Sequence, residues 1–150
     1  MDRFMIRLSI GYPDSEAELE MVKSRLNGNP LETIKQAVTR EQLVAMQKSV
    51  SEVYIRDELI RYIIELITAT RNHPLILRGA SPRATLAVTS ISKALAFVQG
   101  RDYVVPRDIS AAFRQIIPHR LLLSQEAGSR ADAEEEILGH ILKEVPAPKV

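Results

Sequence analysis

The 150-residue sequence contains no cysteine and no tryptophan, and aromatic residues make up only 5% of it. Without cysteine the chain cannot form a disulfide, a thiolate metal site or a cysteine nucleophile. The shortage of aromatic rings argues against a surface that stacks the bases of single-stranded nucleic acid. Lack of cysteine also suits a reducing compartment, so we expect a cytoplasmic protein.

An excess of charge of one sign is missing as well. The sequence has 20 Lys and Arg residues against 19 Asp and Glu residues, and its formal net charge is +1. A balanced chain has no global field that would draw it to DNA or to an anionic membrane. No apolar run approaches the roughly 20 residues that cross a bilayer, and no signal peptide follows Met1. We therefore expect neither a membrane nor a nucleic acid as partner.

The composition that is present is typical of a globular protein. Hydrophobic residues make up 45% of the chain and charged residues 26%, which is too apolar for a disordered chain. A length of 150 residues suits one domain, or one small domain with an appendage.

The N-terminal residues have the alternating pattern of a β-strand. Apolar residues stand at every second position from Phe4 to Ile10, and Gly11-Tyr12-Pro13 then ends the strand. A single strand needs neighbours for its backbone groups. The remaining sequence offers only short candidates, at residues 53–55, 75–77 and 103–105. We therefore expect the partner strands to lie upstream of this sequence.

The rest of the chain is predicted to be chiefly helical. Capping boxes of Ser15 with Glu18 and of Thr39 with Gln42 predict two helix starts. Apolar residues at helical spacing predict the later helices and their buried faces. The expected helices cover residues 15–26, 39–48, 57–71, 84–98 and 106–117, with a last one around 137–142. Gly100 supplies the stop after the fourth.

The buried faces follow from the same spacing. In the helix 57–71 the predicted face consists of Ile60, Ile63, Ile64 and Ile67. In the helix 106–117 it consists of Ile109, Ala112, Phe113, Ile116 and Ile117. Asp108, near the start of that helix, is interpreted as a residue that favours the helix dipole.

Several motifs, in one order along the chain, resemble the MoxR group of AAA+ ATPases. They are Asp2-Arg3-Phe4-Met5, Gly11-Tyr12-Pro13, Thr70-Arg71-Asn72-His73, Gly79-Ala80-Ser81-Pro82-Arg83-Ala84, Gly100-Arg101-Asp102-Tyr103-Val104-Val105-Pro106 with Asp108, and Pro118-His119-Arg120. The resemblance implies a mainly α fold, in which a helical lid follows one strand and one helix of an α/β nucleotide-binding core. It implies a core remnant at residues 1–29, a lid at 30–123, and a spacer, last helix and frayed tail at 124–150.

The resemblance also implies roles for two arginines. Arg3 matches the arginine finger, which reaches into the ATP site of a neighbouring subunit. Arg83 matches the second sensor arginine, which touches the nucleotide of its own subunit. Family members use ATP and Mg²⁺ and form rings. They remodel or mature other proteins in a chaperone-like way, often with a partner that carries a von Willebrand A domain.

The residues around Arg83 are suited to an anion when considered alone. Ser81 is a good N-cap and Pro82 a good first helical residue, so Arg83 projects from the first turn beside free N–H groups. Gly79 is expected to give the preceding turn backbone angles that other residues avoid. The residues alone leave open a simpler interpretation, in which Ser81-Pro82-Arg83 only begins a helix with a solvated arginine.

Two nucleotide motifs of the family are absent from the sequence. None of the six glycines begins the phosphate-binding pattern G-x-x-x-x-G-K-[ST], and no apolar strand ends in acidic residues that could hold magnesium. We therefore expect the 150 residues alone to hydrolyse no ATP and to hold no cofactor tightly. The three histidines, at positions 73, 119 and 140, have no second ligand at metal spacing, so no metal site is expected. The alternative function is a non-enzymatic helical module that binds DNA or a partner protein.

Overall fold

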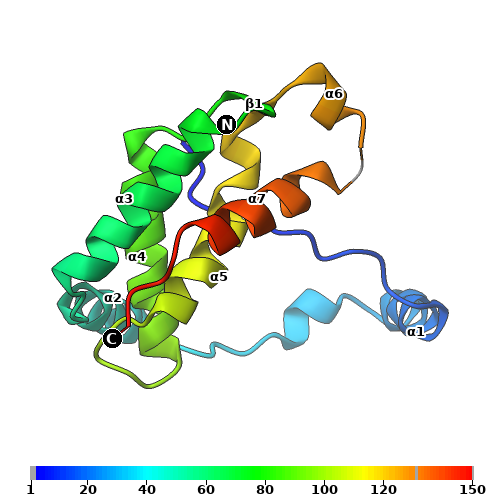
Figure 1. Cartoon of the computed structure of the whole chain (residues 1–150). Helices are drawn as coiled ribbons and strands as arrows, with labels where there is room; N and C mark the ends of the chain where they lie inside the picture. The colour runs from blue at the N-terminus through cyan, green and yellow to red at the C-terminus, as the bar shows by residue number, and fades with distance from the viewer. Residues whose placement is uncertain (1–2, 131, 150) are drawn as a thin grey trace. The chain divides into compact units, whose positions relative to one another are not determined.

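The computed structural model describes residues 3–130 and 132–149, and this part of the chain is mainly α-helical, as predicted (Figure 1). It contains seven α-helices, two 3-10 turns and one two-stranded sheet. The chain forms two compact units. The smaller is Leu8–Met46, and the larger joins Gln47–Val150 to the N-terminal residues up to Arg7. No helix in the described ranges has both the length and the apolarity needed to cross a bilayer.

The smaller unit contains α1 (Ser15–Leu26), the 3-10 turn η1 (Pro30–Thr33) and the first residues of α2 (Arg40–Glu52). Asp14, and not the predicted Ser15–Glu18 box, caps α1, because its Oδ1 accepts from the backbone N of Ala17 at 2.8 Å. No residue of these helices is buried.

The second predicted capping box is confirmed. The side chain of Gln42 accepts from the backbone N of Thr39 at 2.7 Å, and the Thr39 hydroxyl accepts from the N of Gln42 at 3.2 Å. The helix that follows, α2, continues to Glu52, four residues beyond the predicted end at Lys48.

The predicted strand at residues 4–10 does not form. This segment has neither strand pairing nor helix in the structure. The alternating apolar residues give it the capacity for a strand, but a strand forms only when a neighbour takes up its backbone groups. Within the described residues no segment pairs with it.

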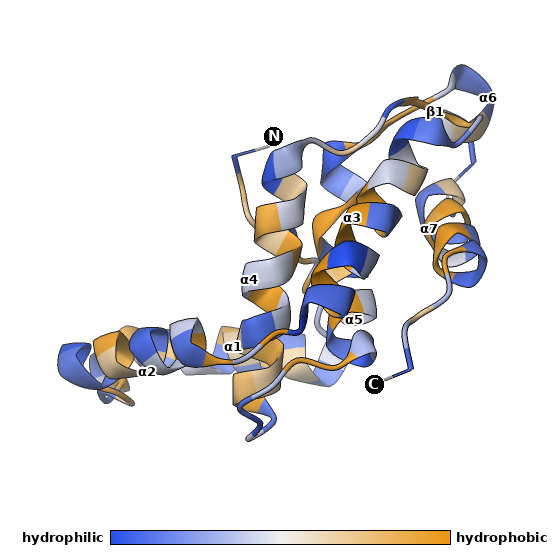
Figure 2. Ribbon diagram, turned by 60° about the vertical axis from the view of Figure 1, so that its left-hand side comes forward, coloured by the Kyte–Doolittle hydropathy of each residue, from blue (hydrophilic) through white to orange (hydrophobic). Residues whose placement is uncertain are grey.

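Four helices enclose the core of the larger unit: α3 (Asp57–Asn72), α4 (Pro82–Val98), α5 (Pro106–Ile116) and α7 (Ala133–Glu144). Helix α4 packs against α3 and α5, and α7 packs against the same two helices. Figure 2 shows hydrophobic residues concentrated on the surfaces that α3, α5 and α7 turn towards one another. A short helix, α6 (Gln125–Gly128), precedes α7.

The predicted face of α5 is confirmed, and that of α3 is shifted. All five residues predicted for the face of the helix 106–117 are fully buried. In α3 the predicted residues Ile63 and Ile67 are buried, but Ile64 is 48% exposed. The buried stripe also contains Leu59, Tyr62 and Leu66. The prediction used only the isoleucines of this helix, whereas leucine and tyrosine side chains on the face towards the core are buried as well.

The short strand candidates do find partners. Strand β1 (Ile76–Arg78) pairs antiparallel with β2 (Leu122–Leu123), with Ile76 opposite Leu123. Tyr54 and Tyr103 form an isolated parallel bridge, so the segments at 53–55 and 103–105 also meet. These pairings tie the ends of the helices together without building a nucleotide-binding sheet.

The loop between α4 and α5 is held by a partly buried ion pair. Gly100 ends the α4 region with a φ of 74°, as expected for a glycine stop. Nη1 and Nη2 of Arg101 donate to the two carboxylate oxygens of Asp108 at 2.8 and 2.7 Å, and the Asp108 carboxylate also accepts from the N of Val105. Asp108 is 1% exposed. It lies in the first turn of α5, as the interpretation as a residue that favours the helix dipole requires, and it is in addition a structural anchor.

Candidate functional site

The loop before α4 is pressed against the last turn of α3. A Cβ atom on Gly79 would lie 2.6 Å from the Cα of Arg71 and 2.7 Å from the carbonyl oxygen of Thr70. Any side chain at position 79 would therefore displace backbone. The φ of Gly79 is not positive, so the predicted reason for this glycine was wrong. Close approach of two backbones, and not an unusual turn angle, requires it.

Ala80 is held to α3 by both of its backbone polar groups. Its N donates to Oγ1 of Thr70 at 3.0 Å, and its carbonyl oxygen accepts from Nε of Arg71 at 2.9 Å. The Thr70 hydroxyl in turn donates to the carbonyl of Ile67 at 2.6 Å. Thr70 and Ala80 are both buried. These contacts set the direction in which the chain enters α4.

Ser81, Pro82 and Arg83 lie where the sequence predicted them. Ser81 is the N-cap residue of α4, Pro82 is its first residue, and the carbonyl of Ser81 accepts from the N of Ala84 at 2.9 Å. Arg83 follows in the first turn and is exposed to solvent. The rigid loop from Gly79 thus presents an arginine at the N-terminal end of a helix, where the dipole favours anions.

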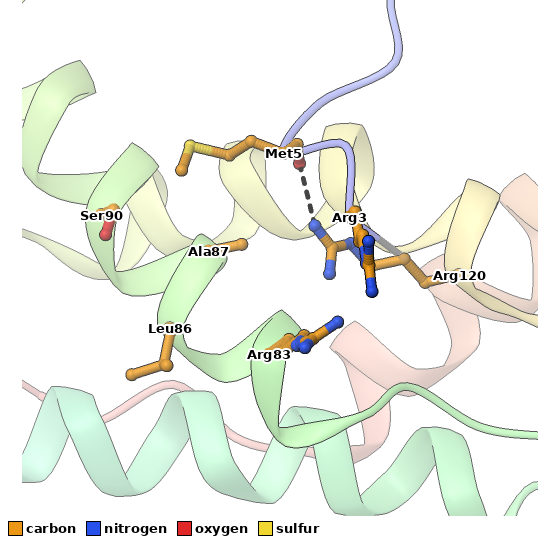
Figure 3. A pocket seen from close by; sticks show the side chains of 7 residues that line it. All are labelled: Arg3, Met5, Arg83, Leu86, Ala87, Ser90 and Arg120. Carbon is orange, nitrogen blue, oxygen red and sulfur yellow. Dashed lines mark hydrogen bonds between the residues drawn. The ribbon is translucent and has the colours of Figure 1, made fainter. Parts of the chain in front are cut away.

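Arg83 lines a pocket of about 290 Å³. Residues of the N-terminal segment line the same pocket. Its lining residues are Arg3, Met5, Arg83, Leu86, Ala87, Ser90 and Arg120. Figure 3 shows the guanidinium groups of Arg3, Arg83 and Arg120 turned towards the same space. The structure therefore brings together the two arginines that the sequence singled out, from positions 80 residues apart.

Arg120 is the arginine of this pocket to which the sequence assigned no role. It lies in the 3-10 turn η2 (Pro118–Arg120) and is only 9% exposed. Its Nη2 donates to the carbonyl oxygens of Phe4 at 2.7 Å and Met5 at 3.4 Å. Nε2 of His119 lies 3.1 Å from the same Phe4 oxygen. The motif Pro118-His119-Arg120 signalled these residues, but not what they contact.

The electrostatics of the pocket favour an anionic ligand. Among the residues that the structure describes, neither Arg3 nor Arg83 forms an ion pair. Guanidinium groups gathered in one place repel one another, and a phosphate with several oxygens relieves that repulsion by accepting hydrogen bonds from each. The residues present therefore fit the phosphate portion of a nucleotide.

The residues that the structure describes offer no comparable arrangement for a metal ion. In the described ranges, no three His, Asp or Glu side chains are grouped so that they could hold one. The rings of His73 and His140 do meet edge to face, with centroids 6.0 Å apart. Burial lowers the pKa of His73, the neighbouring His140 acts in the same direction, and Glu144 opposes them. This pair joins α3 to α7 and lies apart from the arginine pocket.

Comparison with known proteins places these features in a family. The family model of the AAA lid domain matches residues 68–141. Chaperone MoxR1 of Mycobacterium tuberculosis is 30% identical over 158 residues, which cover 99% of this chain and 41% of that protein. The uncharacterised protein YeaC of Bacillus subtilis is 33% identical over 148 residues, which cover 99% of this chain and 46% of YeaC.

A solved structure agrees with the sequence relatives. The crystal structure of a protein from Cytophaga hutchinsonii, described as a candidate ATPase, superposes with a TM-score of 0.87 at 34% identity. The match covers 99% of this chain and 48% of that one. The chain thus spans less than half of the length of each of these relatives. It belongs to the MoxR-type AAA+ ATPases and carries the lid domain of that family.

Proposed function

We propose that this chain acts as the lid of a longer MoxR-type ATPase and that its arginine pocket contacts the phosphates of ATP. The observation that carries the proposal is the shared pocket of Arg3 and Arg83, two exposed arginines without an acidic partner in the described part of the chain. In ATP hydrolysis, bound ATP would supply the γ-phosphoryl group, which is transferred to water. In such a reaction the protein mainly positions groups and neutralises charge.

Arg83 is suited to bind the phosphates because the backbone that carries it is held in place. The Gly79–Ala80 segment is fixed to α3, so the backbone of the first turn of α4 is held beside the pocket that Arg83 lines. A guanidinium stays charged at any relevant pH and donates through a planar fork that matches phosphate oxygens. Arg3 carries the same kind of donor group on the N-terminal segment. We assign Arg83 to the nucleotide of its own subunit and Arg3 to that of a neighbour.

We also propose an assembly and a role for the longer protein. A finger that acts between subunits requires a neighbouring subunit. We propose that the subunits form a ring that remodels or matures other proteins, with a von Willebrand A domain protein as its partner. No acidic cluster in the described ranges can hold Mg²⁺, and the sequence has no phosphate-binding glycine loop. The 150 residues alone are therefore expected to release no phosphate above background.

The proposal is tested by ATP hydrolysis in the full-length protein. Loss of a charge-assisted hydrogen bond of about 1.5–3 kcal/mol predicts that Arg83→Ala raises KM for ATP by roughly 10- to 100-fold. Arg3→Ala should lower kcat by about 10³-fold or more. The control is Arg114→Ala, an exposed arginine that pairs with Glu135 at 3.6 Å on the surface. Equal kinetics for all three variants would contradict the proposal.

Mixing subunits tests which nucleotide each arginine serves. A subunit with Arg3→Ala keeps its own phosphate loop, and a subunit with a disabled loop keeps its finger. If Arg3 acts on a neighbour, mixing the two restores hydrolysis. If Arg83 acts on its own nucleotide, mixing Arg83→Ala subunits with the same partner restores nothing. The opposite pattern would reverse the two assignments.

A further inference from the structure

The N-terminal segment is attached to the helical bundle by an unusual kind of contact. Apolar burial contributes little, because Phe4 is 70% and Met5 50% exposed. Their backbone carbonyls, however, accept hydrogen bonds from residues more than 110 positions away. Figure 3 shows Arg120 reaching the Met5 carbonyl beside Arg3.

Arg120 is well suited to hold a backbone segment. A buried guanidinium is costly unless hydrogen bonds compensate for the lost water, and its bonds to neutral acceptors are strengthened by its charge. At 9% exposure, Arg120 depends on the Phe4 carbonyl at 2.7 Å for part of this compensation. His119, the preceding residue, approaches the same oxygen at 3.1 Å.

The base of this contact is rigid. Turn η2 follows two fully buried residues, Ile116 and Ile117, and the N of Arg120 donates to the Ile117 carbonyl at 2.9 Å. Strand β2 begins two residues after Arg120 and pairs with β1, which leads to the Gly79 loop and α4. The same framework therefore supports Arg120 and Arg83.

We propose that Arg120, assisted by His119, is a positioning residue that ties the segment carrying Arg3 to the lid. Arg3 directly precedes Phe4. The hydrogen bonds to the Phe4 carbonyl therefore hold the backbone from which the Arg3 side chain extends. Arg120 then acts through Arg3 and need not touch the nucleotide. A movement of the lid that follows nucleotide binding would be passed to the finger segment. This inference rests on the proposed function of Arg3.

The tie itself can be tested in the 150-residue chain by NMR of the Met5 methyl group. Arg120→Met keeps an apolar stem and removes the donors, whereas Arg120→Lys keeps the charge without the fork. We expect the Met5 methyl signal of Arg120→Met to move to its random-coil position and sharpen, while the Ile116 methyl signals stay unchanged. Arg120→Lys should give an intermediate result. Arg114→Met is the control and should leave Met5 unaffected.

Two NMR outcomes would overturn the tie. One is an unchanged Met5 signal in a folded Arg120→Met chain. The other is loss of the Ile116 signals in both Arg120 variants, which would make Arg120 a core residue and not a clamp. Neither outcome depends on whether the chain contributes to ATP hydrolysis.

The kinetic consequence is tested in the full-length protein. Misplacement of the finger should make Arg120→Met lower kcat by up to about 10²-fold while KM for ATP stays unchanged. Adding Arg120→Met to Arg3→Ala should cost nothing further. If Arg3→Ala lowers kcat and Arg120→Met does not, the positioning role is wrong. If Arg3→Ala itself leaves kcat unchanged, the proposed function of Arg3 fails and the positioning role fails with it, even where NMR confirms the tie.

Discussion

At the scale of single residues, the partly buried ion pair between Arg101 and Asp108 is expected to stabilise the fold. The carboxylate of Asp108 accepts two hydrogen bonds from Arg101 and one from the N of Val105. The hydrogen bond to Asp108 raises the pKa of Arg101 above its ordinary value, which indicates that the charged pair is favoured in the folded state. The Asp108 carboxylate therefore joins Arg101 to the start of α5.

Asp108→Asn keeps the shape of that side chain and removes its charge. Because a hydrogen bond to a charged group contributes about 1.5–3 kcal/mol, we expect the free energy of unfolding to fall by at least that amount. Asp102→Asn is the matched control, since Asp102 is an exposed residue of the same loop and should change stability by less than about 0.5 kcal/mol. Urea denaturation measures both, and equal effects would contradict the anchor role of Asp108.

Gly79 gives a second test at this scale. A methyl group there would meet the backbone of Arg71 at 2.6 Å, so Gly79→Ala should destabilise the larger unit by about 1–3 kcal/mol. Gly139 lies inside α7 with open space where a methyl group would stand, so Gly139→Ala should stabilise by about 0.5–1 kcal/mol. Thermal unfolding compares the two. A neutral Gly79→Ala would show that the loop is not held as close as described.

The sequence predicted which arginines belong to the site, but not the contacts that hold the site together. Arg3 and Arg83 were found through motifs, and Ser81 and Pro82 through the ordinary chemistry of helix starts. The contacts of Arg120 and Thr70 could not be found in this way, because their partners lie 116 and 10 residues away. Contacts of that range depend on how the elements pack, which no local pattern contains.

At the scale of elements, helices were predicted well and the N-terminal strand was not. Helical spacing, glycine and proline are local signals, so α3, α4 and α5 start and end within a few residues of their predicted bounds. A strand depends on its neighbours. The alternating residues 4–10 remain unpaired in the structure, while the three weak candidates pair because packing brings them together.

The contact between α3 and α7 should make stability depend on pH. His73 is the C-cap residue of α3, and the cavity around it is shared with His140, Arg130 and Glu136. Its pKa is lowered from 6.5 mainly by burial. In the folded state His73 therefore resists protonation, and the unfolded chain takes up the proton first. Stability is full above about pH 6.5 and declines as the pH falls below it.

Melting temperatures between pH 8 and pH 5 test this expectation. His73→Asn keeps an acceptor for the N of Leu75, which donates to Nδ1 of His73 at 3.2 Å, and removes the titrating ring. The decline at acidic pH should shrink in this variant. His140→Asn should reduce the decline only in part, because burial is the larger cause of the lowered pKa. If the melting temperature of His73→Asn falls more steeply with decreasing pH than that of the unaltered chain, protonation of His73 does not destabilise the folded state.

At the scale of the whole molecule, the two units differ in how they are stabilised. The larger unit has a continuous buried core, whereas no helix residue of the smaller unit is buried. Apolar side chains such as Leu19, Val22 and Leu43 stay exposed. Capping boxes predicted the helices of the smaller unit and helical spacing predicted those of the larger one, but neither signal contains what covers an apolar face. The predicted boundaries at residues 29 and 123 remain a prediction.

The proposed function depends most on Arg83, which is expected to contact the phosphates of a nucleotide from the pocket that it lines together with Arg3. The most direct measurement is NMR of the arginine side-chain Nε–H groups of the 150-residue chain during titration with inorganic triphosphate. We predict that the signal of Arg83 shifts, approaches saturation, and returns when salt is added, while that of Arg114 barely moves. An Arg83 signal that stays unchanged, or that shifts no more than that of Arg114, would contradict the proposed function.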